Sequence, residues 1–173
     1  MALELIATAG AADANSYADI ASADAYHESH VYASTWNSAT NVSKAQALVW
    51  ATRLLDTYFE WGGLLASQSQ ALRWPRVSAL DRDGRLLSGS TIPTDLANAT
   101  AEFARGLLAS DRTAEPSSEG GEIKELKVGP IDITYVEGTS TTAPVVPATV
   151  VAMLRHLGTY RSGTGGAISM RRA

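Results

Sequence analysis

The sequence has 173 residues, of which 45% are hydrophobic and 18% charged, and its net charge at pH 7 is −4. This length suits one domain with a single core, and the mild acidity is atypical of a dedicated nucleic-acid binder, which is more often basic. The chain contains no cysteine, which excludes disulfides and thiolate metal sites.

The N-terminal region predicts a short strand and then a first helix. Residues 3–7 are apolar enough to form the strand. Ser22 is a favourable N-cap residue, and the sequence after it predicts a helix over residues 23–34. The polar residues that follow interrupt this pattern, so the helix is expected to end there.

The clearest amphipathic segment is a helix over residues 44–60. Ser43 and Gln46 have the spacing of a capping box. Apolar residues recur after it with helical spacing, while Asp56 falls on the opposite, polar face. The glycine pair at 62–63 is expected to end the helix.

Residues 62–92 form an unusually long connection. A connection of this length is usually functional or disordered, and Trp74 argues against disorder because it supplies a hydrophobic anchor. Asp83 and Gly84 form a turn dipeptide that predicts a small hairpin within the connection.

Two further helices and one hairpin are predicted in the rest of the chain. Pro93 at the first position and Asp95 in the first turn predict a helix over residues 93–109. Residues 122–137 alternate apolar and polar residues on either side of a glycine-proline turn, which predicts a β-hairpin. Pro147 begins the last helix.

Together these elements predict a mainly α fold, a small bundle of about four helices with a β-hairpin and extended loops or arms. Residues 1–158 are expected to form a single domain. Residues 159–173 are glycine-rich and basic, and we expect them to be a flexible C-terminal arm.

No motif in the sequence supports catalysis or metal binding. His27 and His30 flank Glu28, but a zinc-protease helix needs its histidines four residues apart. Residues 81–84 imitate the start of a calcium loop, but the later acidic ligands are missing. No serine follows the strand-turn-helix pattern of a nucleophile elbow. We therefore expect neither an enzyme nor a cofactor.

The arginines around Trp74 allow three interpretations. In the first, they form a basic groove in which the tryptophan stacks on bases, as in single-strand binders. Alternatively, Trp74 anchors the connection and the arginines pair with carboxylates of the same chain. In the third, they form a subunit contact, since tryptophan and arginine dominate interface hot spots. The net acidity of the chain favours the last two together.

Five segments in this order resemble a known family. They span residues 14–30, 47–63, 70–84, 92–108 and 127–138, and the most specific are "QALRWPR" and "KVGPI". The chain is similar to the small head-tail connector, or adaptor, proteins of tailed bacteriophages, a group often described as putative DnaT-like single-stranded-DNA-binding proteins. His27 departs from the family pattern, in which an aromatic residue is more usual.

The resemblance implies a structural role in the virion. Such proteins form a ring, of about twelve subunits, beneath the portal, where it extends the DNA channel and offers a surface for tail attachment. The implied partners are copies of the chain, the portal protein, and a tail or tail-terminator (stopper) protein. Double-stranded DNA would pass through the channel without specific binding, since an acidic wall repels phosphate. The alternative function is single-stranded-DNA binding.

The implied location is the neck of the virion, after assembly in the host cytoplasm. No membrane partner is expected, because no apolar run approaches the roughly 20 residues that span a bilayer. Trp74 is expected to anchor the connection, and the C-terminal arm to become ordered when it docks on the portal. The candidate contacts with a subunit, portal or tail are Arg73, Trp74, Pro75, Arg76, Val128, Gly129, Pro130, Arg161, Arg171 and Arg172.

Overall fold

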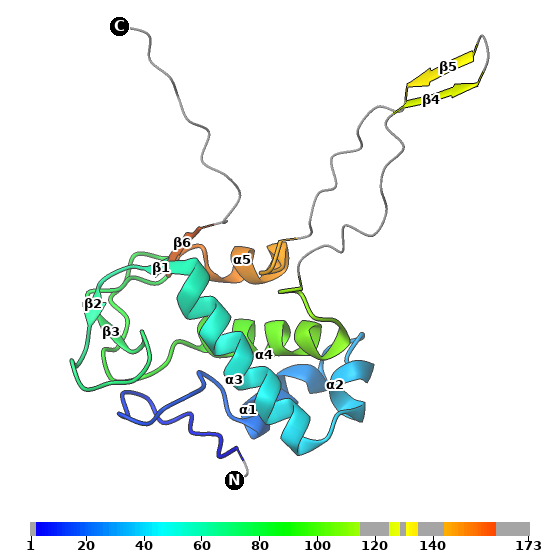
Figure 1. Cartoon of the computed structure of the whole chain (residues 1–173). Coiled ribbons are helices and arrows are strands. Elements are labelled where there is room, and N and C mark those ends of the chain that lie inside the picture. Colours follow the sequence, from blue (N-terminus) through cyan, green and yellow to red (C-terminus); the bar gives the residue numbers. More distant parts are fainter. Residues whose placement is uncertain (1–2, 115–124, 129–130, 135–143, 162–173) are drawn as a thin grey trace, which may run out of the picture.

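The computed structural model describes residues 3–114, 125–128, 131–134 and 144–161 (Figure 1). Within these ranges the fold is mainly α, which confirms the expected class. The helices are α1 (Ile20–Glu28), α2 (Ser34–Ser38), α3 (Asn41–Tyr58), α4 (Thr94–Ala109) and α5 (Ala148–Leu154).

Three antiparallel strand pairs accompany the helices in the described part of the chain. β1 pairs with β6, β2 with β3, and β4 with β5. Their bounds are β1 (Phe59–Trp61), β2 (Leu64–Leu65), β3 (Arg76–Val77), β4 (Glu125–Val128), β5 (Ile131–Thr134) and β6 (Gly158–Tyr160). The pair of β4 and β5 confirms the hairpin predicted over residues 122–137.

Helix α4 is the centre of the bundle, since it packs against α1, α2, α3 and α5 (Figure 1). Leu96 and Phe103 on α4 are fully buried, as are Leu48 and Leu55 on α3. Burial of each such side chain is worth about 1.5–3 kcal/mol. The other side chains of α4 in the core are mostly alanines, which let neighbouring helices approach closely.

The first helix differs from its prediction at both ends. The carboxylate of Asp19 accepts a hydrogen bond from the backbone N–H of Ser22 (2.7 Å), so Asp19 is the N-cap and α1 begins at Ile20. The helix ends at Glu28, because His30 Nδ1 accepts the N–H of Tyr32 (3.0 Å) and holds the following backbone outside a helix. The single helix expected over residues 23–34 is therefore wrong.

Helix α3 begins three residues before its predicted start. Thr40 Oγ1 accepts the backbone N–H of Ser43 (3.2 Å), so the cap is Thr40, and the predicted capping box of Ser43 and Gln46 is wrong. At the other end, Phe59 is extended and enters β1, so the chain leaves the helix before the glycine pair.

Part of the expected C-terminal arm belongs to the folded body. Thr159 and Tyr160 lie in β6 and pair with Glu60 and Phe59. The N–H of Arg161 donates to the carbonyl of Tyr58 (2.7 Å), which extends this contact. The rest of the expected arm, residues 162–173, lies outside the described residues.

The strand expected over residues 3–7 does not form in the described structure. The side chain of Asn15 takes the place of a neighbouring strand instead. Its Oδ1 accepts the N–H of Ile6 (2.8 Å), and its Nδ2 donates to the carbonyl of Glu4 (2.7 Å). Both backbone groups are thus satisfied without a β-ladder.

The remaining helix predictions are confirmed within one residue. Pro93 and Pro147 are the N-cap residues of α4 and α5. The backbone of both is extended, with ψ of 138° and 145°, so the first helical residues are Thr94 and Ala148. Asp95 lies in the first turn of α4, as expected.

The N-cap of α3 provides a test of its observed start. The Thr40→Ala change should lower the free energy of unfolding by about 1 kcal/mol, because it removes the acceptor for a backbone N–H of the first turn. Gln46→Ala, at an exposed position, should change it by less than about 0.5 kcal/mol. Urea denaturation followed by circular dichroism measures both. A larger effect of Gln46→Ala than of Thr40→Ala would restore the predicted capping box.

Candidate functional site

Trp74 anchors the long connection between β1 and α4 in the core. Only 1% of its surface is exposed, and the adjacent Pro75 is also buried. Its ring meets Trp61 edge-on, with 6.0 Å between the ring centroids. The expected anchor is confirmed, and the buried ring has no face open for stacking on a base.

Asp56 joins three parts of the chain at this anchor. Its Oδ1 accepts hydrogen bonds from the hydroxyl of Tyr17 (2.5 Å) and from Nε1 of Trp61 (3.0 Å). Its Oδ2 accepts the backbone N–H of Arg73 (3.3 Å). The N-terminal segment, β1 and the connection therefore meet on one carboxylate of α3.

Burial is the dominant electrostatic effect at this carboxylate. Desolvation raises the pKa of Asp56, although the hydrogen bonds from Tyr17, Trp61 and Arg73 act in the opposite direction. Desolvation, together with the charge of Asp56, also raises the pKa of Tyr17 well above its usual value. The placement of Asp56 on a polar, outward face of the helix is therefore wrong.

Arg76 binds backbone carbonyls of its own chain. Its guanidinium donates to the carbonyls of Gly62 (2.6 Å), Gly63 (2.7 Å) and Arg73 (3.1 Å). The neighbouring Gln70 has a similar role, since its Nε2 donates to the carbonyl of Pro75 (3.1 Å). Gln70 and Arg76, which both belong to the motif "QALRWPR", thus fold the connection back on itself.

A small hairpin closes the second half of the connection. Leu80 and Leu86 form an antiparallel bridge, and Gly84 has a positive φ of 79°. Oδ1 of Asp81 accepts the N–H groups of Asp83 (2.9 Å) and Arg85 (2.8 Å), and these bonds lower the pKa of Asp81. The hairpin predicted at residues 83–84 is confirmed, and Asp81 serves as a turn acceptor.

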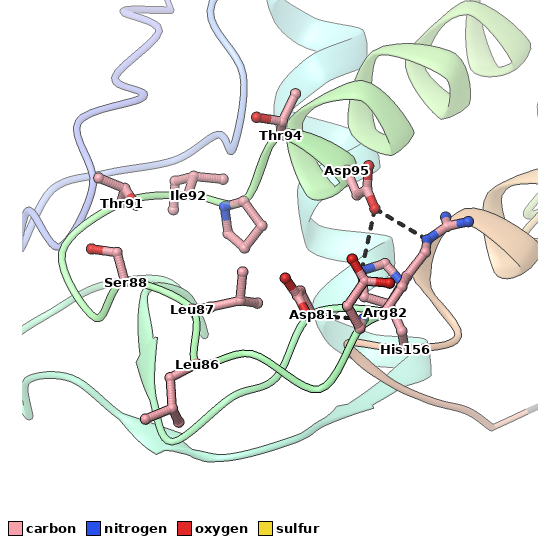
Figure 2. Close-up of a pocket in the computed structure, with 12 residues that line it drawn as sticks. Asp81, Arg82, Leu86, Leu87, Ser88, Thr91, Ile92, Thr94, Asp95 and His156 are labelled. Carbon is pink, nitrogen blue, oxygen red and sulfur yellow. Dashed lines mark hydrogen bonds and ion pairs between the residues drawn. The ribbon is translucent and has the colours of Figure 1, made fainter.

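An open cavity of about 480 Å³ lies between this hairpin and the start of α4; we call it the α4 pocket (Figure 2). Leu86, Leu87 and Ile92 contribute its apolar lining. On the polar side, Oδ2 of Asp95 lies 3.4 Å from Nε of Arg82 and 3.2 Å from Nε2 of His156. The pocket thus combines an apolar wall with charged groups.

Helix α5 holds the polar side of the α4 pocket in place. The guanidinium of Arg82 also donates to the carbonyl of Met153 (3.1 Å). Burial lowers the pKa of His156, while the carboxylate of Asp95 acts in the opposite direction. Sequence reasoning missed this pocket, because His156 is distant in sequence from residues 81–95.

The connection carries several exposed apolar side chains. Five of its large hydrophobic side chains are exposed, and the outermost, Leu86, retains 74% of its surface. The others are Leu64, Leu65, Val77 and Leu80. Exposed apolar side chains gathered on one segment are typical of a protein-binding surface.

The predicted contact residues differ in their exposure, and Arg76 is half-buried with the carbonyl partners given above. Arg73 is exposed on the connection, whereas Trp74 and Pro75 are buried beneath it. Arg161 is also exposed and pairs with the carboxylate of Glu60. Val128 ends β4. The remaining residues, Gly129, Pro130, Arg171 and Arg172, lie outside the described residues.

Most arginines in the described ranges are already engaged within the chain. Arg105 pairs with Glu102, and Arg112 donates to the carbonyls of Val145 (3.0 Å) and Pro144 (2.9 Å). Arg76, Arg82 and Arg161 have the intrachain partners given above. These contacts engage five of the nine arginines in the described ranges, which reduces the positive charge available to a nucleic-acid backbone.

The histidine of α1, His27, has a structural role. His27 is buried, its Nε2 lies 3.1 Å from the carbonyl of Ala101, and its ring packs 4.8 Å from that of Trp36. His27 thus occupies a core position that suits an aromatic residue. Among the described residues, no group of three histidine, aspartate or glutamate side chains is placed to hold a metal ion. No helix in these residues is long and apolar enough to cross a bilayer.

A family model described as "Putative DnaT-like ssDNA binding protein" matches residues 1–173. No curated protein matches the chain, and no solved structure does. The family description agrees with the alternative function from the sequence, single-stranded-DNA binding, and says nothing of head-tail connectors.

The buried anchor can be tested by mutation. Trp74→Ala should lower the free energy of unfolding by about 3–5 kcal/mol, because it leaves a cavity in the core. Arg73→Ala, at the exposed neighbouring position, should change it by less than about 0.5 kcal/mol. Chemical denaturation measures both. Equal, small effects of the two changes would mean that the connection is not anchored.

The raised pKa of Asp56 predicts how stability depends on pH. The folded chain holds this proton more tightly than the unfolded chain, so the contribution of Asp56 to stability is greatest below its unfolded pKa of about 4. That contribution falls as the pH rises through the folded pKa.

Asp56→Asn removes the titrating group, so its unfolding free energy should lack this fall. Denaturation of both proteins between about pH 4 and pH 7 gives the difference. A difference that grows in favour of the native chain as the pH rises would mean that the hydrogen bonds outweigh desolvation.

Proposed function

We propose that this chain, which belongs to the family described as putative DnaT-like ssDNA binding protein, is a structural assembly subunit rather than an enzyme, and that it serves as a head-tail connector of a tailed bacteriophage. In this role it forms a ring beneath the portal, extends the DNA channel and offers a surface to the tail. Its partners are copies of itself, the portal protein and a tail or stopper protein, at the neck of the virion.

The observation that carries this proposal is the orientation of the connection over residues 62–92. Its aromatic residue and the guanidinium of Arg76 are used inside the chain. Four of its leucines and Val77 are exposed instead. Arg73, Arg82 and Arg85 are exposed as well, but a single-strand surface pairs basic groups with exposed aromatic rings, and the one aromatic ring of the connection is buried. An outward apolar surface supports contact with another protein.

The connector role in particular rests on the resemblance, with support from charge. The chain is acidic overall, and an acidic channel wall lets a duplex slide because it repels phosphate. The buried positions of Trp74 and Pro75 give the motif "QALRWPR" a scaffold role that suits a subunit built to present loops.

Single-stranded-DNA binding remains the second candidate, and the family description supports it more directly than it supports the connector. One structural feature favours it as well. Trp50 on α3 is 42% exposed, and Arg53 on the same helix is also exposed. An exposed tryptophan beside an arginine can stack on a base and contact a phosphate.

An oligonucleotide titration separates the two functions. Fluorescence anisotropy of a labelled single strand should show no saturable binding at about 10 µM protein and about 50 mM salt, where a dedicated binder would already bind. Trp50→Ala and, as a control on the same helix, Val42→Ala should behave like the native chain. Micromolar or tighter binding that weakens steeply with salt and is lost only in Trp50→Ala would establish the second candidate.

A further inference from the structure

We propose that Tyr32 of one copy docks into the α4 pocket of a second copy, so that copies join head to tail. This inference rests on the proposed assembly function, for which it supplies the two contacting surfaces. We call Val31 and Tyr32 the α2 knob, because they lie just before that helix.

The α2 knob is the most exposed apolar feature in the described part of the chain. Val31 retains 88% of its surface and Tyr32 77%. Solvation of two adjacent large side chains is unfavourable, and an aromatic residue is a frequent centre of protein interfaces. The exposure therefore favours a partner for this position.

The backbone beneath the α2 knob is fixed by α4. The N–H of Tyr32 donates to Nδ1 of His30 (3.0 Å), and its carbonyl accepts a hydrogen bond from Arg105 (3.3 Å). Glu102 holds both supports, since it pairs with Arg105 and lies 3.6 Å from Nε2 of His30. A projecting residue whose backbone is already ordered loses little entropy on binding.

The α4 pocket fits a tyrosine side chain chemically. Leu86, Leu87 and Ile92 offer apolar contacts to a ring, and the carboxylate of Asp95 can accept a hydrogen bond from its hydroxyl (Figure 2). Asp83 also lines the pocket and offers a second carboxylate. Tyrosine is buried most favourably where one end is apolar and the hydroxyl has a partner. A cavity of about 480 Å³ is large enough to receive the ring.

The knob and the pocket are attached to different ends of α4. Arg105 supports the knob near the end of the helix, whereas Asp95 lines the pocket in its first turn. Ten residues of α-helix separate these positions by about 15 Å. Because one rigid helix holds both features apart, the knob of one copy is available to the pocket of another.

A contact between two different surfaces has a defined consequence for assembly. Each copy retains a free knob at one end and a free pocket at the other, so addition can continue. Such a contact gives a ring when the rotation between copies closes and a filament when it does not. A two-fold contact, by contrast, would stop at a dimer.

Two single-surface variants and their mixture test this arrangement by sedimentation velocity. Tyr32→Ala and Leu86→Asp should each weaken self-association at least about tenfold, the effect of one hot-spot residue. Mixed in equal amounts, they should form a one-to-one dimer and nothing larger, because each variant retains one of the two surfaces. Val42→Asp, an exposed apolar position outside both surfaces, should associate like the native chain.

Three results would overturn the inference. They are a native chain that stays monomeric up to about 1 mM, native association that neither variant weakens, and a mixture that associates no better than its components. Any of these results leaves the proposed assembly function dependent on contacts with the portal and tail proteins. The oligonucleotide titration judges that function separately.

Discussion

The carboxylate of Asp56 holds the long connection on the helical bundle. A carboxylate taken out of water is costly unless donors surround it, and here the donors come from Tyr17, Trp61 and the backbone of Arg73. Each donor belongs to a different part of the chain, so satisfying one buried group fixes three segments at once. Trp74 follows directly after the last donor and is thereby directed into the core.

The outward surface is a consequence of this inward anchor. Since Trp74 is buried and Arg76 binds carbonyls of residues 62 and 63, the connection cannot use either group outside. Leu64, Leu65, Leu80 and Leu86 remain exposed, while Leu72 and Leu87 pack against the core. The same fold brings Arg82, which lines the α4 pocket, against α5. A rigid scaffold that carries apolar loops is well suited to binding other proteins, as loops on rigid supports usually carry function.

Sequence alone predicts the parts whose local chemistry allows one outcome. Proline at 93 and 147 marks the start of each helix to within one residue, and the dipeptide at 83–84 predicts a tight turn. Around α1 and α3 several residues can cap, and only the fold selects among them. Asp56 has the spacing of a polar helix face, and helical periodicity cannot reveal that a distant connection covers it. The α4 pocket is hidden for the same reason, since it joins segments far apart in sequence.

Amide hydrogen exchange of the free chain tests the central claim, that residues 62–92 are a fixed surface and not a loose connection. The account predicts that the amides of Ala66, Arg73 and Leu87, which donate to Pro75, Asp56 and Ala79, exchange at least about a hundredfold more slowly than in an unstructured peptide. Exchange of all three at the rate of an unstructured peptide would contradict it.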